Sequence, residues 1–430
     1  SPQAGRHRPT WRTEKMIRED LRDRMRSLAR AGREASRAMA RAGGARKDAV
    51  LFEAARLLDE RRKDIMEAND RDLAAARDAG MDSAKLDRLA LTPAVIDSMI
   101  AACREVAAQD DPVGAIESMT KRPNGLMVGR MRVPLGVVCM IYESRPNVTI
   151  DAAILCLKAG NAVILRGGSE AFHSNQALGR ILRDALVSQG LPADVAQVLD
   201  TTEREAVSHL LKLDDYIDVV IPRGGEGLIR AVVEQATMPV LKHYKGVCHL
   251  YVDAGADLDQ ALHLAMNGKC QRPGVCNALE CLLVHESVAR AFLPRVAGGL
   301  GAAGVEFRAC PVSLPLLGPR AREAAPEDWG HEFHALVLAV RVVPDMNAAL
   351  AHIAAYGSNH TEAICTRDHA RAMRFLREAD ASMVAVNAST RFNDGGQLGL
   401  GAEIGISTSK LHAYGPMGAR ELTSTKFVVL

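Results

Sequence analysis

The sequence has few aromatic residues and almost no excess of charge. Phe, Trp and Tyr make up 4% of its 430 residues, and its formal net charge is +2. The low aromatic content argues against a surface on which bases stack, and the balance of charge argues against a strongly anionic partner. We therefore expect no nucleic-acid partner.

Long apolar runs are also missing. The longest, residues 135–142, contains a glycine and is far shorter than the roughly 20 residues that cross a bilayer. Residues 1–15 hold Pro2, Pro9 and several arginines without an apolar period, which predicts a disordered extension and no signal peptide. We expect no membrane association and a cytoplasmic location.

The nine cysteines do not form a metal-binding or disulfide pattern. Their number is odd and most stand inside apolar runs, which is typical of a reducing compartment. Cys270, Cys276 and Cys281 are separated by six and five residues, which does not match a Cys-x-x-Cys knuckle. We predict no metal site.

What is present is the composition and length of a soluble enzyme with several domains. Hydrophobic residues make up 48% and charged residues 25% of the chain, and 430 residues predict two or three domains. Residues 16–110 have helical periodicity, and Asp48 is a candidate cap for one helix. The apolar face of that helix is formed by Leu51, Ala54, Ala55 and Leu58.

Strands and helices alternate from residue 127 onward. This alternation predicts an α/β fold with parallel strands and helices on both faces. The expected strands are 127–132, 137–142, 162–165, 196–199, 219–221, 249–252, 279–284, 333–343, 383–386 and 426–430. The expected helices include 149–159, 204–211, 258–266, 286–296 and 346–355.

Residues 271–278 place Cys276 in a short polar loop just before an apolar strand. Arg272 and the backbone amides that follow it would favour a thiolate that attacks a substrate. A buried structural cysteine is the alternative, and it is the more common fate of this residue type.

Two glycine-rich turns follow predicted strands. Residues 165–169 read Leu-Arg-Gly-Gly-Ser, and residues 223–227 read Arg-Gly-Gly-Glu-Gly. Such turns expose backbone N–H groups to a phosphate. Neither matches Gly-x-Gly-x-x-Gly, so a plain strand-to-helix turn explains them equally well.

Three other polar positions have both a functional and a structural interpretation. In residues 142–147, Arg145 could bind a carboxylate or phosphate, and Asn147 could donate to an oxyanion or cap a helix. Glu332 could bind a ribose or lie on the surface. The hydroxyl and amide groups that follow strand 383–386 suit an amino-acid head group or a solvated turn.

Residues 142–147, 165–170, 271–278 and 386–390 together resemble the γ-glutamyl phosphate reductases of the aldehyde dehydrogenase superfamily. The resemblance extends from about residue 16 to the C-terminus. It implies an aldehyde dehydrogenase-like α/β fold with a Rossmann-type cofactor domain, an α/β catalytic domain and a small β oligomerisation element.

The resemblance also implies the limits of these domains. The NADP-binding domain would comprise 16–126 and 143–252, the catalytic domain 253–407, and the oligomerisation strands 127–142 and 408–430. We expect a homodimer or homotetramer.

The site residues follow from the same resemblance. Cys276 would be the nucleophile and Asn147 an oxyanion donor. The cofactor would be held by Arg166, Gly167, Gly168, Ser169, Gly224, Gly225 and Glu332. The substrate would be held by Arg145, Arg272, Asn387, Ser389 and Thr390. An arginine at position 166 favours NADPH, because guanidinium binds a 2′-phosphate in a planar fork.

Two cysteines differ from the resembling enzymes, and one segment differs from hydrolytic aldehyde dehydrogenases. Cys270 and Cys281 stand where threonine is more typical, so we expect them to pack, and either could form a disulfide with Cys276 under oxidation. Residues 243–249 lack the glutamate general base of hydrolytic aldehyde dehydrogenases. An enzyme that exchanges its thioester with phosphate needs no such base.

The reaction implied is the reduction of L-glutamyl 5-phosphate by NADPH, through a Cys276 thioester, in proline biosynthesis. An acyl-CoA is the alternative acyl donor. Because an acyl phosphate is short-lived in water, transient contact with glutamate 5-kinase is a further expectation.

Overall fold

The computed structural model describes residues 11–430, and their side chains from Glu19 onward. The chain divides into two compact units: unit 1 extends to Leu241 and also contains Gly418–Leu430, and unit 2 is Lys242–Met417. Of the expected disordered extension, residues 1–10 lie outside the described residues, whereas residues 11–15 form the start of helix α1 (Trp11–Ala40). No helix in the described part of the chain is long and apolar enough to cross a membrane.

Unit 1 is built on a parallel four-stranded sheet in the order β5-β4-β3-β6. Its strands are β3 (Val137–Tyr142), β4 (Ala162–Arg166), β5 (Ala196–Val198) and β6 (Val219–Arg223). The chain adds β4 and β5 on one side of β3 and then returns to place β6 on the other. This reversal is the switch point at which Rossmann-type sheets bind their ligands.

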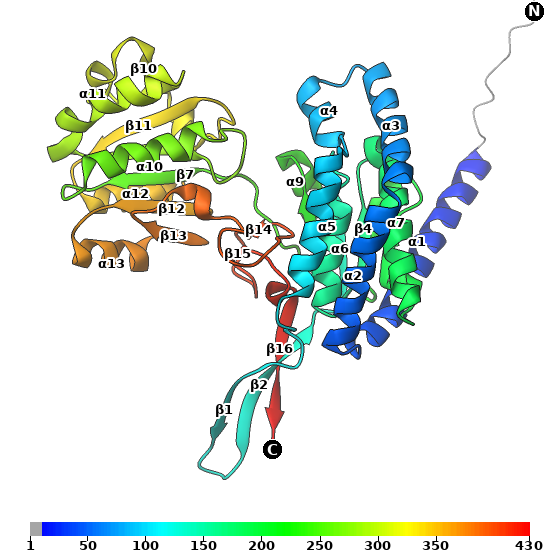
Figure 1. Cartoon of the computed structure of the whole chain (residues 1–430). Helices are drawn as coiled ribbons and strands as arrows, with labels where there is room; N and C mark the ends of the chain where they lie inside the picture. The colour runs from blue at the N-terminus through cyan, green and yellow to red at the C-terminus, as the bar shows by residue number, and fades with distance from the viewer. Residues whose placement is uncertain (1–10) are drawn as a thin grey trace, which may run out of the picture. The chain divides into compact units, whose positions relative to one another are not determined.

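Helices cover both faces of this sheet (Figure 1). The helices of unit 1 are α1, α2 (Gly44–Glu60), α3 (Arg62–Asp78), α4 (Ser83–Leu89), α5 (Pro93–Ala107), α6 (Val148–Lys158), α7 (Phe172–Ser188), α8 (Arg204–Leu210) and α9 (Glu226–Gln235), of which α1, α6, α7 and α9 contact the strands. The prediction that Asp48 caps a helix is wrong, because α2 begins after Gly43. Asp48 instead pairs with the fully buried Lys158 at 2.6 Å.

Three antiparallel strands form a separate sheet in unit 1. They are β1 (Ile116–Lys121), β2 (Met127–Pro134) and β16 (Thr423–Val429), with β2 in the middle. The predicted oligomerisation strands need correction: residues 137–142 belong to the parallel sheet, and residues 116–121 join the antiparallel one. The antiparallel sheet reaches away from the helices of unit 1 (Figure 1).

Unit 2 contains a parallel seven-stranded sheet in the order β10-β9-β11-β8-β7-β12-β13. Its strands are β7 (Cys248–Val252), β8 (Leu279–His285), β9 (Glu306–Ala309), β10 (Ala321–Glu323), β11 (Val337–Val343), β12 (Thr361–Cys365) and β13 (Met383–Val386). The prediction that residues up to 252 belong with the cofactor domain is wrong, because β7 is an inner strand here. Residues 333–336, expected to be part of a strand, precede β11.

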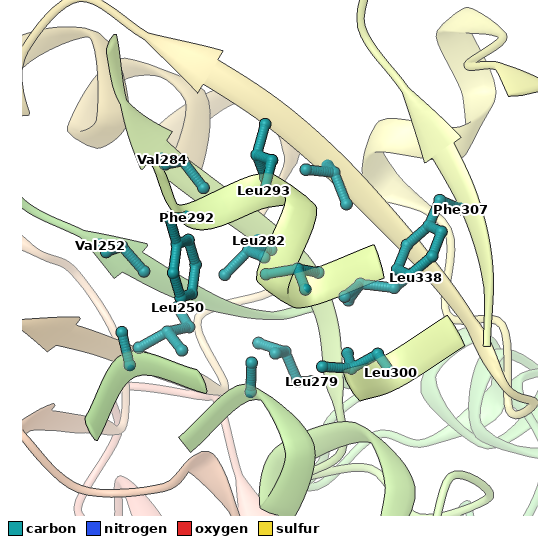
Figure 2. Close-up of a cluster of buried hydrophobic side chains, with 14 of the residues drawn as sticks. Leu250, Val252, Leu279, Leu282, Val284, Phe292, Leu293, Leu300, Phe307 and Leu338 are labelled. Carbon is teal, nitrogen blue, oxygen red and sulfur yellow. The ribbon is translucent and has the colours of Figure 1, made fainter. Parts of the chain in front are cut away.

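Apolar side chains fill both faces of this sheet. Helices α10 (Leu258–Cys270) and α11 (Glu286–Ala302) cover one face, where Leu250, Leu282 and Phe292 are among the fully or almost fully buried residues (Figure 2). Helices α12 (Met346–Tyr356) and α13 (His369–Glu378) cover the other face. The strands are buried on both sides, as expected for a parallel sheet.

Candidate active site

The strands of unit 1 that flank the switch point end together. Ile141 of β3 pairs with Arg166 of β4, and Tyr142 pairs with Arg223 of β6. The glycine-rich turns at 167–169 and 224–225, which were predicted to follow strands, therefore begin at the same end of the sheet. Helix α9 starts directly after Gly225, so its backbone N–H groups lie at the same edge.

Close approach of side chains explains three of these glycines, among them Gly168, where a Cβ atom would lie 2.1 Å from Glu170 Oε1. A Cβ atom at Gly167 would lie 2.1 Å from Asn175 Nδ2, and one at Gly224 would lie 2.5 Å from Glu143 Oε2. Gly225 has open space around it, and its N–H donates to Glu143 Oε2 at 3.0 Å. The turns therefore keep exposed backbone at the sheet edge.

Arg166 has unused hydrogen-bonding capacity. Its Nε is buried and has no hydrogen-bond partner, and its Nη2 reaches the Thr202 carbonyl only at 3.5 Å. Burial lowers the pKa of this guanidinium. An anionic ligand at this position would satisfy the unpaired donor.

The next turn, after β3, holds Arg145 and Asn147. Ser144 has a positive φ of 48°, and its N–H donates to Glu170 Oε1 at 2.7 Å. Asn147 stands before α6 but its side chain does not cap the helix; Nδ2 donates to Asp151 Oδ2 at 2.9 Å. Arg145 is exposed. An oxyanion role for Asn147 stays a prediction.

In unit 2, the Cys276 loop joins the end of α10 to the start of β8. Lys269 and Glu280, one on each side of the loop, form a fully buried pair at 2.7 Å. Burial raises the pKa of Glu280 to about 7, against the opposing effect of the Lys269 charge. This pair ties together the two ends of residues 270–279.

The backbone of Cys276 is closely packed, while its side chain is half-buried. The buried Cys248 thiol donates to the Cys276 carbonyl at 3.3 Å. A Cβ atom at Gly246 would lie 1.7 Å from the same carbonyl oxygen, so only glycine fits there. The loop is therefore positioned by residues that the sequence analysis had not assigned to the site.

Two histidines lie beside the Cys276 thiol. One ring nitrogen of His243, one of His360 and Cys276 Sγ all lie within 4.8 Å of one another. His243 Nδ1 is 2.8 Å from the Ile406 carbonyl, an acceptor, so Nδ1 carries the proton. Burial lowers the pKa of His360 to about 3 and keeps it neutral. The buried His360 is therefore a poor proton acceptor, and the half-buried His243 is the candidate that accepts the thiol proton.

Two arginines supply positive charge near the thiol. Arg391 Nε donates to Gln271 Oε1 at 3.1 Å. Burial and the charge of Arg272 lower the pKa of Arg391, while the Cys276 thiolate acts in the opposite direction. Arg272 and Arg391 therefore favour the thiolate and an anionic substrate. Arg272 was predicted to contact substrate, and it lies in the Cys276 loop as expected.

Residues 389–393, which follow β13, contact the Cys276 loop. Asn277 Nδ2 donates to the Asn393 carbonyl at 3.0 Å. Ser389 is buried and accepts from the Arg391 N–H at 3.3 Å, and Thr390 has a buried hydroxyl without a hydrogen-bond partner. The structure thus brings the segment of Ser389 and Thr390 to the Cys276 loop, and their contact with substrate stays a prediction.

Asn387 has a structural role that the sequence analysis did not anticipate. Its Oδ1 accepts from the Thr366 N–H at 2.9 Å and its Nδ2 donates to the Thr366 carbonyl at 2.8 Å. These bonds hold Asn387 at a positive φ of 53°. With both polar atoms used by one backbone residue, Asn387 is a weak candidate for substrate binding.

Glu332 also lies close to the thiol loop. Its carboxylate is 3.3 Å from His334 Nε2 and raises the pKa of that histidine. The His334 carbonyl is 3.9 Å from the position of a Cβ atom on Gly274. Glu332 is largely buried, so a solvated surface glutamate is excluded.

Cys270 and Cys281 differ in their surroundings. Cys270 is half-buried at the end of α10, and burial raises its pKa. Cys281 is fully buried on β8, and its Sγ is 3.6 Å from His352 Nε2. The thiol that contacts the Cys276 backbone is Cys248, which the sequence analysis had not considered.

Comparison with known proteins agrees with this arrangement. Residues 13–304, more than half of the chain, match the aldehyde dehydrogenase family. The chain is 68% identical to the γ-glutamyl phosphate reductase of Solidesulfovibrio magneticus, over 94% of this chain and 97% of the relative. It is 59% identical to that of an Anaeromyxobacter species, over 96% and 97%. The chain belongs to the γ-glutamyl phosphate reductases, within the aldehyde dehydrogenase family.

Solved structures of this reductase family share the fold. The crystal structure from Thermotoga maritima aligns with a TM-score of 0.92 at 45% identity, covering 94% of this chain and 98% of that one. An acetylating aldehyde dehydrogenase from Geobacillus thermoglucosidasius, at 18% identity, has a TM-score of 0.69 over 96% of this chain and 98% of that one, which shows the shared fold alone. Membership in the reductase family implies a nicotinamide cofactor.

Proposed function

We propose that this chain reduces L-glutamyl 5-phosphate to L-glutamate 5-semialdehyde with NADPH and releases phosphate. The observation that carries the proposal is the surroundings of Cys276. Its Sγ, one nitrogen of His243 and one nitrogen of His360 all lie within 4.8 Å of one another, and Arg272 belongs to the same loop. A thiol, a proton acceptor and positive charge are what attack on an anionic acyl donor requires.

The first step forms a thioester. Nε2 of His243 accepts the thiol proton, and the thiolate attacks the acyl carbon. The C–S bond forms as the C–O bond to phosphate breaks, and the phosphate leaves with its electron pair. Arg272 and Arg391 stabilise the negative charge of the phosphate and of the tetrahedral oxyanion.

The second step returns the thiol. NADPH, when bound, would supply the hydride that reduces the thioester carbonyl to the thiohemiacetal anion. When this species collapses, the C–S bond breaks, Cys276 leaves as a thiolate and the semialdehyde forms. The histidine that accepted a proton in the first step protonates the departing thiolate, so the residues regain their initial state.

The edge of the unit 1 sheet supports the cofactor assignment. The turn at 167–169 and the first N–H groups of α9 could bind the pyrophosphate, and Arg166 has an unpaired buried Nε for a 2′-phosphate. Glu332 would accept hydrogen bonds from the nicotinamide ribose. Asn147 and Arg145 remain candidates for the oxyanion and the substrate carboxylate.

The reverse reaction tests the chemistry. Glutamate semialdehyde and NADP⁺ are mixed with reduced protein, with and without inorganic phosphate, and absorbance of NADPH is followed. We expect NADPH to form only with phosphate, because residues 243–249 contain no carboxylate to activate water. Formation without phosphate would identify a hydrolytic enzyme, and replacement of phosphate by coenzyme A would identify an acyl-CoA reductase.

We also propose that the sheet of β1, β2 and β16 joins subunits of a homo-oligomer. Its outer strands carry exposed apolar side chains: Ile116, Phe427 and Val429 are 47%, 67% and 54% exposed. Exposed edge strands of this kind pair with another chain. Phe427→Asp should lower the mass measured by light scattering without changing the circular dichroism spectrum, whereas an unchanged mass would place the subunit contact elsewhere.

A further inference from the structure

The cluster around Cys276 has the composition of a metal-binding site. Cys276 Sγ, one nitrogen of His243 and one nitrogen of His360 lie within 4.8 Å of one another, although the residues stand 33 and 84 positions apart in sequence. A thiolate and two imidazoles are ligands that Zn²⁺ prefers, and sites with three protein ligands leave the fourth position to water.

The hydrogen bonds behind the two rings suit metal binding. His243 Nδ1 donates to the Ile406 carbonyl at 2.8 Å, which leaves Nε2 as the ring's lone-pair nitrogen. His360 Nδ1 lies 2.7 Å from Thr361 Oγ1, and that oxygen accepts a second hydrogen bond from Asn393 Nδ2 at 2.8 Å. Zinc-binding histidines are typically oriented by such outer contacts.

His360 Nε2 provides the independent sign of a ligand. His360 is fully buried, yet this nitrogen has no hydrogen-bond partner. A buried polar atom without a partner is unfavourable, and a metal ion at this position would occupy its lone pair.

We propose that Cys276 Sγ, His243 Nε2 and His360 Nε2 bind one Zn²⁺ ion, with water as the fourth ligand, and that this ion blocks the thiol. Binding forms a Zn–S bond and releases the thiol proton to solvent, without oxidation or reduction. The ion and the acyl donor compete for the same sulfur. Zn²⁺ therefore inhibits the chain reversibly, and a chelator restores the thiol.

A second cluster of the same composition serves as an internal comparison. His249, Cys281 and His352 also bring three potential ligand atoms within 4.8 Å of one another, in the interior of unit 2. There, however, Arg341 Nη1 donates to His352 Nδ1 at 2.9 Å, so the proton of the neutral ring sits on Nε2 and faces Cys281. This tautomer opposes metal binding, so we expect the second cluster to take no ion.

Direct metal binding tests the proposal on the full chain, fully reduced and without substrate. Zn²⁺ binding is measured by titration calorimetry, and Co²⁺ is added separately to detect a thiolate-to-metal charge-transfer band. We expect about one ion per chain. Cys276→Ser should remove the band and weaken Zn²⁺ binding by more than the roughly 10- to 100-fold that loss of an outer-shell partner costs.

Two control variants locate the ion. Cys281→Ser and Cys270→Ser should bind Zn²⁺ as the unchanged chain does, and His243→Ala, at a half-exposed residue, should bind it more weakly. Zn²⁺ should also protect Cys276 from alkylation by iodoacetamide, as read by mass spectrometry of the peptides. Circular dichroism confirms that each variant is folded.

Three outcomes would overturn the proposal. They are equal Zn²⁺ affinity in the unchanged chain and in Cys276→Ser, loss of binding only in Cys281→Ser, and no binding at micromolar Zn²⁺. Because these measurements use no substrate, a chain that failed to reduce glutamyl phosphate could still bind the ion, and the reverse also holds.

Discussion

The two parallel sheets present their functional residues at opposite ends. In unit 1, Arg166 is the last residue of β4 and the glycine turns follow β4 and β6, so all lie at the carboxyl ends of the strands. In unit 2, Cys276, His360 and Cys248 precede or begin β8, β12 and β7, at the amino ends. Both units contain a parallel sheet, but unit 1 has its candidate cofactor residues at the carboxyl ends of the strands and unit 2 has its candidate catalytic residues at the amino ends.

The difference follows from where helix termini lie. At the carboxyl ends in unit 1, helices begin, and their N-terminal N–H groups attract a phosphate without charged side chains. At the amino end of β8, α10 has just ended, and its C-terminal carbonyls disfavour an anion. The charge needed by a thiolate must therefore come from side chains, and Arg272 and Arg391 provide it.

The largest effect is expected from removal of the Cys276 thiol, which lies at the amino ends of the unit 2 strands. Cys276→Ala should lower turnover by at least about 1,000-fold, because no covalent intermediate can form. NADPH binding, measured by fluorescence titration, should be unchanged, since the expected cofactor residues at the strand ends of unit 1 are intact. Cys270→Ser is the control and should retain activity. Substantial turnover by Cys276→Ala would refute the covalent mechanism.

Removing the buried charge pair should destabilise unit 2 strongly. Lys269→Met leaves Glu280 buried without a partner, and breaking such a pair costs about 3–5 kcal/mol. The decrease should appear in urea unfolding of the unit 2 transition.

The exposed pair of Lys63 and Glu67 provides the control, since both side chains are more than half exposed. Lys63→Met should change stability by no more than about 0.5 kcal/mol. Similar effects of Lys269→Met and Lys63→Met would show that the buried pair does not hold the loop.

The role of Arg166, at the carboxyl end of β4, is tested by the preference of the enzyme for NADPH over NADH. Arg166→Leu should raise the KM for NADPH by roughly 10- to 100-fold, the value of a charge-assisted hydrogen bond. The KM for NADH should stay nearly constant, because NADH lacks the 2′-phosphate. Arg204→Leu is the matched control. An equal rise in the KM for NADPH and for NADH would mean that Arg166 does not bind the 2′-phosphate.

The smallest expected effect concerns pH and the buried His352. Burial, His249 and Arg341 together hold its pKa near 3, below the ordinary value of 6.5. The unfolded chain therefore binds a proton below about pH 6.5 that the folded chain does not, so stability falls as pH decreases.

Between pH 7 and pH 5 this loss amounts to about 2 kcal/mol. His352→Gln should lack this loss, so the loss should appear as the difference between the stability curves of the two proteins, measured by urea unfolding at each pH. Glu362 and His249, whose Nδ1 is 2.9 Å from the carboxylate, are present in both proteins and cancel. Parallel pH curves for the two proteins would show that His352 is not held neutral.

Sequence patterns identified most of the parallel strands and the Cys276 loop, because apolar runs between glycines reflect burial directly. They did not identify β9, β10, β12 or α13, and the unit boundary was placed after β7. Short inner strands such as β12, which begins with Thr361 and Glu362, contain polar residues whose partners lie far away in sequence. Local periodicity contains no information on such partners.

The site shows the same limit. Arg166 and the glycine turns could be predicted from their place after strands. His243 and His360 could not, since single histidines without a regular spacing give no signal until the fold brings them to Cys276. Asn387 was predicted to bind substrate, but only the structure reveals its two bonds to the Thr366 backbone.

Gly246 illustrates how a residue without functional groups can limit evolutionary change. Any side chain there would displace the Cys276 carbonyl, which lies 1.7 Å from the Cβ position. A library containing every substitution should therefore show position 246 to be as intolerant as position 276 when growth depends on this activity, whereas the exposed Gly298 of α11, with nothing within 4 Å of its Cβ position, should accept many replacements. Selection would then conserve the absence of a side chain at position 246 as strictly as it conserves the thiol of Cys276.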